Sequence, residues 1–225
     1  MVDLPKVLAT NPIFAPLSPA QREQLASHCL SRTFEKGEFI TLYGDVWPYF
    51  FVVGQGRVDG VKESREGRRL LMLTLQQSDV FWGLAFFEEG LPMPVTLEAH
   101  ERTELHLWLR QDILPVLLAN GHALWELSRL MVSRIQQASD IVEGLAFQPV
   151  AARLARFLLD QFGDIPDAPV SRDFTLDEMA AVVGTTREMV CRVLYRLADD
   201  DLIHITRTEF TLTNKTGLSH LAEQV

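Results

Sequence analysis

The spacing of hydrophobic and polar positions changes near residue 30 and again near residue 110. The first thirty residues favour helices, with Ser18 as an N-cap and Pro19 at the first helical position. From Thr33 to Trp108, short β-prone runs alternate with Lys-Gly, Gly-Asp, Gly-Gln-Gly and Glu-Gly turns, about ten residues apart. This alternation predicts a small antiparallel barrel or roll.

A long helical segment follows from Arg110 to Phe147, with apolar residues at steps of three and four. The stripe persists over more than five turns, so it is close to a coiled-coil repeat. Two interpretations stay open: the helix lies on its own roll, or the stripe is the seam of a dimer. The stripe consists of Leu124, Leu127, Met131, Ile135, Ala138, Val142 and Leu145.

Pro149 restarts a helix that ends at Gly163, and a Pro- and Asp-rich segment, 164–173, follows as a linker or loop. Two short helices come next, TLDEMAAVVG and TREMVCRVLYRLADDD, and the alternation in LIHITRTEFTLT predicts a hairpin. Two helices joined by a Gly turn and followed by a hairpin are the layout of a winged helix-turn-helix. The chain is therefore expected to be α+β, with three parts: a roll domain (1–118), a long helix (119–146) and a winged helix-turn-helix domain (147–225).

Local signals place the ends of the two short helices. Thr175 with Glu178 forms a capping-box pattern at the start of the first, and Gly184 ends it in a left-handed conformation. Thr185 with Glu188 forms a second capping-box pattern at the start of the next helix.

The second helix buries Val190, Val193, Leu194 and Leu197 and turns Arg187, Glu188, Cys191, Arg192, Tyr195 and Arg196 to the opposite face. Arginine can donate two hydrogen bonds to guanine O6 and N7, and glutamate can accept from cytosine N4. The alternative is a solvated surface in which Glu188 only caps the helix and pairs with Arg192. The hairpin directly after the helix favours DNA binding. The candidate DNA contacts are Thr185, Thr186, Arg187, Glu188, Cys191, Arg192 and Arg196.

Net charge limits how such a helix can work. The whole chain carries −9, and the part from Leu145 onward has eight Lys or Arg against twelve Asp or Glu, a net of −4. Between Thr185 and Leu197, however, three arginines stand against one acid. We therefore expect specific base contacts with weak affinity for random DNA.

Composition excludes several classes of protein. No apolar run reaches about 18 residues and the N-terminus lacks the order of a signal peptide, so a cytoplasmic protein without a membrane partner is expected. Cys29 and Cys191 are far apart, which argues against a disulfide framework. Cys191 is either a redox switch or a thiol with no function. No phosphate-loop, nucleophile-elbow or HExxH motif is present, so no enzyme activity is expected.

Nearly the whole chain resembles the CRP/FNR superfamily of bacterial transcription regulators. The stretch from KGEFITLYGD to LQQSDVF resembles the cyclic-nucleotide-binding roll, FFEEG its capping turn, and GTTREMVCRVLYRL its recognition helix. The resemblance implies that Arg187 and Arg192 contact guanines and Glu188 a cytosine in a half-site like TGTGA. It also implies a homodimer on an inverted repeat and contact with RNA polymerase.

The sensor segment FWGLAFFEEGLPMPVTLEA departs from that pattern. Trp82-Gly83 stands where the family has Gly-Glu for the ribose, and Met93-Pro94 where it has Arg-Ser for the cyclic phosphate. A phosphate buried without its arginine is poorly compensated, so cyclic AMP is not the expected effector. The apolar residues here either line a cavity for a hydrophobic ligand or fill the vacated pocket as core. The candidate pocket residues are Trp82, Gly83, Leu84, Ala85, Phe86, Phe87, Met93, Pro94, Val95, Ala138 and Ser139.

Other effectors of the family fit no better. Two cysteines cannot hold a four-cysteine iron–sulfur cluster, and the haem-binding branch uses a histidine that this segment lacks. The spacing of His100 and His106 is a weak metal signal, and solvent-facing histidines are expected. An effector other than cyclic AMP and no effector at all both stay open. The alternative function is a ligand-binding module that acts on protein partners without specific DNA binding.

Overall fold

The computed structural model describes residues 4–163, 169–171, 174–206 and 208–224. Its contacts divide the chain into two compact units. The first combines Met1–Lys62 with Met72–Gln137, and the second combines Glu63–Leu71 with Ala138–Val225. This division falls inside the long helix α4 (Gly121–Phe147), whereas the sequence pattern places domain boundaries at the two ends of that helix.

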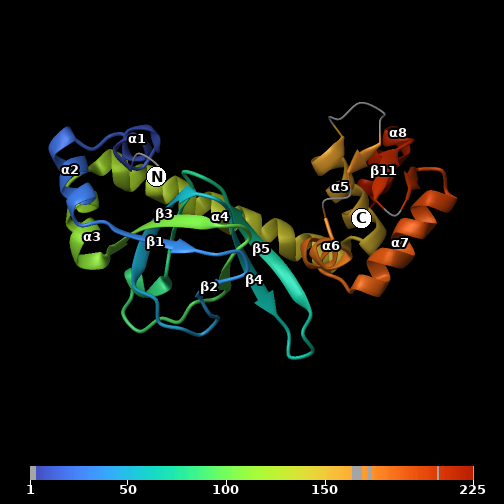
Figure 1. Cartoon of the computed structure of the whole chain (residues 1–225), viewed down its shortest axis with the longest axis horizontal. Helices are drawn as coiled ribbons and strands as arrows, with labels where there is room; N and C mark the ends of the chain where they lie inside the picture. The colour runs from blue at the N-terminus through green and yellow to red at the C-terminus, as the bar shows by residue number, and fades with distance from the viewer. Residues whose placement is uncertain (1–3, 164–168, 172–173, 207, 225) are drawn as a thin grey trace. The chain divides into compact units, whose positions relative to one another are not determined.

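The predicted roll is confirmed as two four-stranded antiparallel sheets, with the strand orders β1-β8-β3-β6 and β2-β7-β4-β5 (Figure 1). The strands are β1 (Leu30–Phe34), β2 (Phe39–Thr41), β3 (Tyr49–Gln55), β4 (Val58–Glu63), β5 (Arg69–Leu75), β6 (Val80–Trp82), β7 (Thr96–Ala99) and β8 (Thr103–Leu109). A single 3₁₀ turn, η1 (Leu84–Phe86), follows β6.

Strand β3 reads as an unbroken apolar run because both of its faces are buried. Phe50 and Val52 pack against the helices of this unit, and Phe51 and Val53 point between the two sheets. Successive side chains of a strand alternate between its faces, so one strand contributes to two cores. The roll consequently has a core between its sheets and a second core under its helices.

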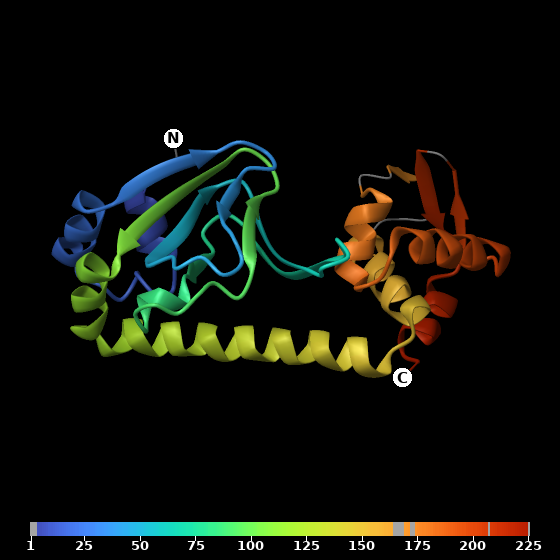
Figure 2. The same cartoon turned by 90° about the horizontal axis from the view of Figure 1, so that it is seen from below.

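Three short helices lie together at one end of the roll (Figure 2). They are α1 (Leu4–Thr10), α2 (Pro19–Ser27) and α3 (Arg110–Leu118). The expected N-cap of α2 is confirmed: the Ser18 hydroxyl accepts from the backbone N–H of Gln21, whose side chain accepts from the Ser18 N–H. The indole of Trp108 donates to the carbonyl of Leu25 at 2.7 Å and ties this end to β8.

The long helix expected over 119–146 corresponds to α4, but the wider helical segment expected from Arg110 to Phe147 is interrupted before it. α3 ends at Leu118, and α4 starts at Gly121 after Ala119 and Asn120. The Asn120 side chain accepts from the backbone N–H of Ala123 and so caps α4. Among the described residues, no helix is long and apolar enough to cross a membrane.

Helix α4 has two different apolar faces. Leu127 is buried in the helical core of the roll domain, and Leu124 and Met131 pack against that core. A second set is exposed: Trp125, Val132, Ile135 and Val142. The expected seam is therefore wrong in its first half: Leu124, Leu127 and Met131 hold α4 to its own roll. The neighbouring stripe that starts at Trp125 is exposed instead.

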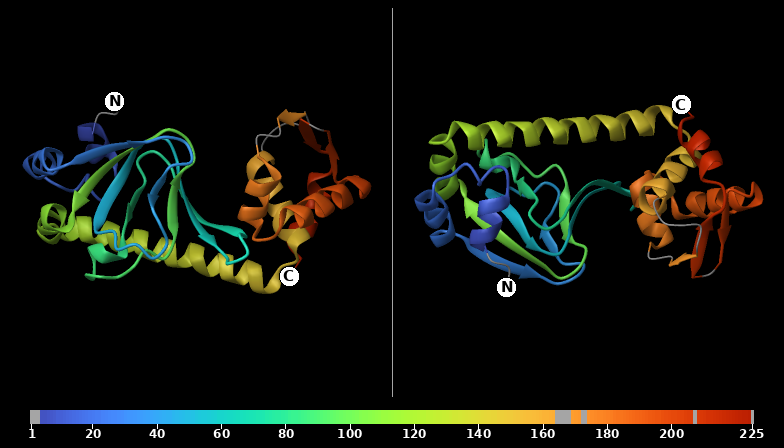
Figure 3. Two further views of the ribbon diagram at one scale, coloured as in Figure 1. Left: turned by 60° about the horizontal axis from the view of Figure 1, so that its bottom comes forward. Right: turned by 90° about the horizontal axis from the view of Figure 1, so that it is seen from above.

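The second unit contains the predicted helix-turn-helix and hairpin (Figure 3). Its helices are α5 (Val150–Phe162), α6 (Leu176–Val183), α7 (Arg187–Asp199) and α8 (Lys215–Ala222), and its strands are β9 (Val170–Ser171), β10 (Ile203–Ile205) and β11 (Glu209–Leu212). β9 pairs with β11 and makes the hairpin a three-stranded sheet, although its segment was expected to be a linker or loop. The rest of 164–173, apart from Pro169, lies outside the described residues.

The signals around the turn are confirmed. Thr175 and Glu178 form a reciprocal capping box at the start of α6. Gly184 ends α6 in the left-handed region, with φ of 69°. The positive φ of this turn favours glycine, and a Cβ at Gly184 would also make the exposed Leu145 side chain move, because it would lie 2.5 Å from Cδ2 of Leu145.

Candidate nucleic-acid interface

Helix α7 starts one residue later than its sequence pattern suggests. Its N-cap is Thr186, whose hydroxyl accepts from the backbone N–H of Met189. The expected capping box of Thr185 with Glu188 is therefore wrong, because Glu188 falls at the second helical position instead of the third. Glu188 is left exposed in the first turn, where the positive end of the helix dipole favours its charge.

Ionisation of Glu188 is further supported by local hydrogen bonds. Its own backbone N–H and the Thr186 side chain hydrogen-bond the carboxylate and lower its pKa, and Arg187 lowers it further. A carboxylate that stays ionised at neutral pH is an acceptor only, as recognition of a cytosine amino group requires.

The exposed face of α7 contains the cations expected there. Arg187, Arg192 and Arg196 are exposed, and Cys191 is half-buried beside them. Arg187 pairs with Asp177 at 3.4 Å, and Arg196 with Asp200 at 3.9 Å. Exposed pairs of this length contribute little, so both guanidinium groups can exchange these partners for DNA at small cost. Thr185 and Thr186, at the helix start, are half-buried.

Arg153 is a supporting residue that the sequence pattern did not reveal. Its guanidinium donates to the carbonyls of Val183, Gly144 and Gln148 at 2.8, 3.1 and 2.5 Å. It thus supplies a charged donor to the Val183 and Gln148 carbonyls at the ends of α6 and α4. The Gly144 carbonyl also accepts from the backbone N–H of Gln148. Desolvation lowers the pKa of Arg153, but the group stays charged because arginine does not deprotonate in proteins.

Replacing Arg153 by methionine is expected to reduce the free energy of unfolding of the second unit by roughly 1–3 kcal/mol, because three carbonyls lose a charged donor. Chemical denaturation followed by circular dichroism measures the loss. Arg156→Met is the matched control, since Arg156 makes one such bond, to Ala222, and should lose less. Equal losses in the two variants would contradict the role assigned to Arg153.

The sensor domain has no room for the ribose-binding side chain of the family pattern. At Gly83, a Cβ would overlap the carbonyl oxygen of Trp47 and press on its ring. The backbone N–H of Gly83 donates to the carbonyl oxygen of Tyr49 at 2.9 Å. This bond holds Gly83 beside the segment that contains Trp47. The Trp47 ring is itself buried, with Tyr49 and Phe51 at centroid distances of 5.3 and 5.4 Å. The residues present therefore do not fit a cyclic nucleotide held in that way.

The other candidate pocket residues do not form one lining. Met93, 1% exposed, and Val95 belong to the core between the sheets, whereas Trp82 and Phe86 belong to the core under the helices. The hypothesis that all these residues line one cavity is therefore wrong. β6 and η1 point the rings of Trp82 and Phe86 to the face of the sheet that is opposite Met93 and Val95. Ala85 is also buried, Gly83 and Leu84 lie beside it, and Phe87, Pro94, Ala138 and Ser139 are exposed.

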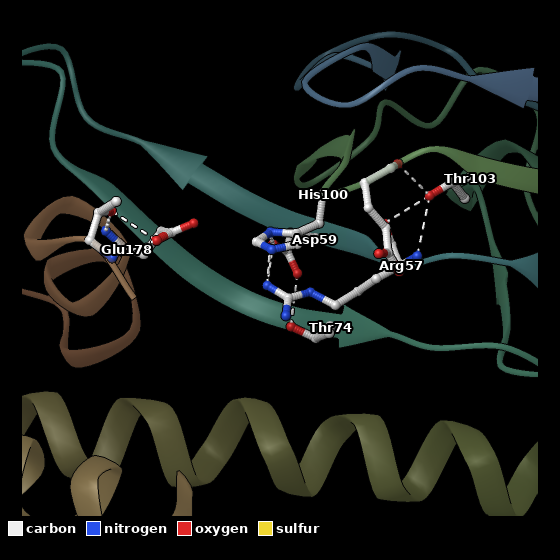
Figure 4. A network of polar contacts seen from close by, with 8 residues as sticks. Arg57, Asp59, Thr74, His100, Thr103 and Glu178 are labelled. Carbon is white, nitrogen blue, oxygen red and sulfur yellow. Dashed lines mark hydrogen bonds and ion pairs between the residues drawn. The ribbon is translucent and has the colours of Figure 1, made fainter. Parts of the chain in front are cut away.

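Neither His100 nor His106 faces solvent freely, which corrects the expectation for both. Nδ1 of His100 lies 2.9 Å from Oδ2 of Asp59 and 2.8 Å from Nη2 of Arg57 (Figure 4). The Asp59 carboxylate also accepts from Thr74 at 3.0 Å, so the group ties β4 to β5 and to the turn after β7. Among the described residues, no cluster of His, Cys, Asp or Glu suits a metal ion.

His106 is 2% exposed, and its Nδ1 lies 2.9 Å from the Ser31 hydroxyl. Burial lowers its pKa from the usual 6.5. The folded state therefore favours the neutral His106 ring. The stability of the fold contains the full contribution of this neutral ring above pH 6.5 and loses it as pH falls towards the lowered pKa. We expect the unfolding free energy to fall by up to about 1.4 kcal/mol per pH unit in this window.

Denaturant titrations between pH 5 and 8 test this, with His106→Leu as the variant that removes the titrating ring. The variant should lose part of the slope below pH 6.5. An unchanged slope would assign the effect to other groups.

Both cysteines are free. Burial raises the pKa of Cys29 to about 11, so this thiol is unreactive at neutral pH.

The fold and site define a DNA-binding transcription regulator with a cyclic-nucleotide-binding type of domain. Family models match in two places: a cyclic nucleotide-binding domain over residues 31–120 and a Crp-like helix-turn-helix domain over residues 152–221. The chain belongs to the CRP/FNR family of regulators.

Known relatives agree with this assignment. The chain is 28% identical over 186 residues to the cAMP-activated global transcriptional regulator CRP of Salmonella typhimurium, covering 80% of this chain and 88% of that protein. It is 29% identical over 200 residues to the cAMP-activated global transcriptional regulator Vfr of Pseudomonas aeruginosa, covering 81% and 89%.

Solved structures show the same fold. A CRP/FNR-family transcriptional regulator from Thermus thermophilus superposes with a TM-score of 0.68 at 25% identity, covering 87% of this chain and 99% of that one. The c-di-GMP responsive global regulator CLP of Xanthomonas campestris gives a TM-score of 0.73 at 22% identity, covering 87% and 99%.

Proposed function

We propose that this regulator reads an inverted-repeat operator through α7, with Arg187 and Arg192 on guanines and Glu188 on a cytosine of a TGTGA-like half-site. The observation that supports this most is the exposed face of α7, which joins arginines to a carboxylate held ionised in the first turn. The side chains offer two bidentate donors and one acceptor, which suit guanine and cytosine edges in the major groove. Thr185, Thr186, Cys191 and Arg196 flank these readers.

Selection of duplexes from a randomised library by the full-length protein tests the proposal. We expect enrichment of two inverted half-sites with centres about one helical turn, roughly 34 Å, apart. Failure to enrich any sequence at low salt, with and without cell extract, would favour the alternative of a ligand-binding module that acts on protein partners.

The inverted repeat requires a dimer, and the exposed stripe of α4 suits its seam. Trp125 and Val132 are seven residues apart, as are Ile135 and Val142, and Val132 and Ile135 are three apart. Positions at this spacing form the a and d seam of a two-stranded coiled coil. We therefore shift the proposed seam from Leu124, Leu127 and Met131 to this stripe and keep Ile135 and Val142 from the sequence pattern.

Replacing Ile135 by aspartate should convert the dimer to a monomer at micromolar concentration, because a charge would be buried at the centre of the seam. Ile135 is 70% exposed in the single chain, so the fold itself should be unaffected. Sedimentation velocity measures the change, and Val46→Asp, at an exposed position of the roll, is the control. A wild-type monomer, or a variant that remains dimeric, would contradict this seam.

The effector is proposed to be other than cyclic AMP, or absent. Trp47 leaves no space for a side chain at Gly83, and Met93 is core, so neither the ribose nor the phosphate contact of the family pattern can form. With no effector, the abundance of the protein would be its only control. Contact with RNA polymerase is proposed from the family alone.

A further inference from the structure

Tyr195 is the largest exposed side chain on the α7 face that the proposed readers do not explain. It is 63% exposed, and it makes no hydrogen bond or ring contact with the described residues. The core of this domain includes Val190, Leu194 and Leu197, so folding does not require an aromatic ring at position 195.

Helix geometry places Tyr195 in line with the reading face. It follows Glu188 by seven residues, which brings it back within about 20° of Glu188 and about 10.5 Å further along the axis. It follows Arg192 by three residues, an axial step of about 4.5 Å that is comparable to one base-pair spacing. Arg196 is turned by about 80° from the line of Glu188, towards the flank where a DNA backbone would run.

The same line ends one turn later at Asp199, followed by Asp200 and Asp201. Carboxylates at this end of the helix repel phosphates, so the DNA-facing part of α7 stops before them. Tyr195 is thus the last uncharged side chain on the reading line. A ring at the centre of a groove-facing stripe points to base edges, whereas phosphates lie at the flanks.

We propose that Tyr195 is a further specificity-determining residue, whose ring packs on the C5-methyl group of a thymine about one step beyond the guanine read by Arg192. Apolar contact with this methyl group is the usual way to read thymine in the major groove, because cytosine and the purines lack it. This inference rests on the proposed DNA-reading function and assigns a reader to one more base pair of the half-site.

The experiment uses full-length wild type, Tyr195→Phe, Tyr195→Ala and Arg192→Ala. Each selects duplexes from the same randomised library, and binding is then measured on the wild-type consensus duplex with single thymines replaced by uracil, which lacks only the methyl group. Tyr43→Ala is the matched control, because Tyr43 is similarly exposed, at 68%, but lies in the roll domain.

One thymine-to-uracil replacement should weaken wild-type binding by about threefold to fivefold for each half-site, in line with the burial of one methyl group. Tyr195→Phe should keep both this sensitivity and the thymine preference, and Tyr195→Ala should lose both. Tyr43→Ala should behave as wild type.

Several outcomes would overturn the inference. Tyr195→Ala could select the same thymine as wild type, or no uracil replacement could weaken wild-type binding. Equal and sequence-independent losses in Tyr195→Phe and Tyr195→Ala would instead assign a phosphate contact to the hydroxyl group. In these cases a loss in Arg192→Ala still supports the proposed function, whereas failure of wild type to select any sequence rejects both proposals.

Discussion

Replacing Arg192 by alanine is expected to weaken sequence-specific DNA binding strongly while leaving the fold intact. Arg192 lies on the exposed face of α7 and is not part of the buried core of its domain. A bidentate arginine–guanine pair contributes about 1–3 kcal/mol of discrimination, and a dimer has two such pairs. The dissociation constant for the selected duplex should therefore rise by roughly 30-fold to 10⁴-fold.

A fluorescence titration with labelled duplex measures this effect, and circular dichroism checks the fold. Arg102→Ala is the matched control: Arg102 is an exposed arginine that pairs with Glu35 in the roll, and its loss removes the same charge. If Arg102→Ala weakens binding as much as Arg192→Ala, the effect is one of net charge and the assignment of Arg192 fails.

Replacing Gly83 by alanine is expected to destabilise the roll domain by about 3 kcal/mol or more. The added Cβ would overlap the Trp47 carbonyl oxygen, which is backbone and cannot rotate away. Overpacking of this kind usually costs about 1–3 kcal/mol when a flexible side chain can yield, and more when the backbone must move. Trp47→Ala should not rescue the variant, because the overlapping atom is not in the side chain.

Gly121→Ala is the control, because a Cβ at Gly121 meets no atom within 4 Å. Thermal unfolding compares the two variants. The same packing predicts that Gly83→Glu combined with Met93→Arg and Pro94→Ser does not create a cyclic AMP site, which calorimetric titration measures. A stable Gly83→Ala protein would contradict the packing around Trp47.

The fold could be predicted from sequence wherever the pattern is local. The Ser18 cap, the Thr175–Glu178 capping box and the Gly184 turn each depend on residues within three or four positions, and all three are confirmed. The break at Ala119 and Asn120 falls at the boundary predicted between the roll domain and the long helix, but the Asn120 cap that starts α4 was not predicted. Strand β9 was missed because two residues in a Pro- and Asp-rich segment pair with a distant strand.

The candidate site was less predictable where it depends on tertiary contacts. Exposure of Arg187 and Arg192 follows from helix periodicity, but the three bonds of Arg153 join segments up to 30 residues apart. Trp47 could not be connected with Gly83 because the contact crosses between loops. On α4, periodicity shows that a stripe is apolar, yet it cannot tell the residues that pack on the roll from those that stay exposed.

The most direct test of the central claim is the affinity of wild-type protein for the selected inverted repeat, relative to a scrambled duplex of the same length, at physiological salt. The predicted result is a preference of at least about 10³-fold, because the acidic domain gains little from non-specific contact with phosphates. Equal affinities for the two duplexes would contradict the account.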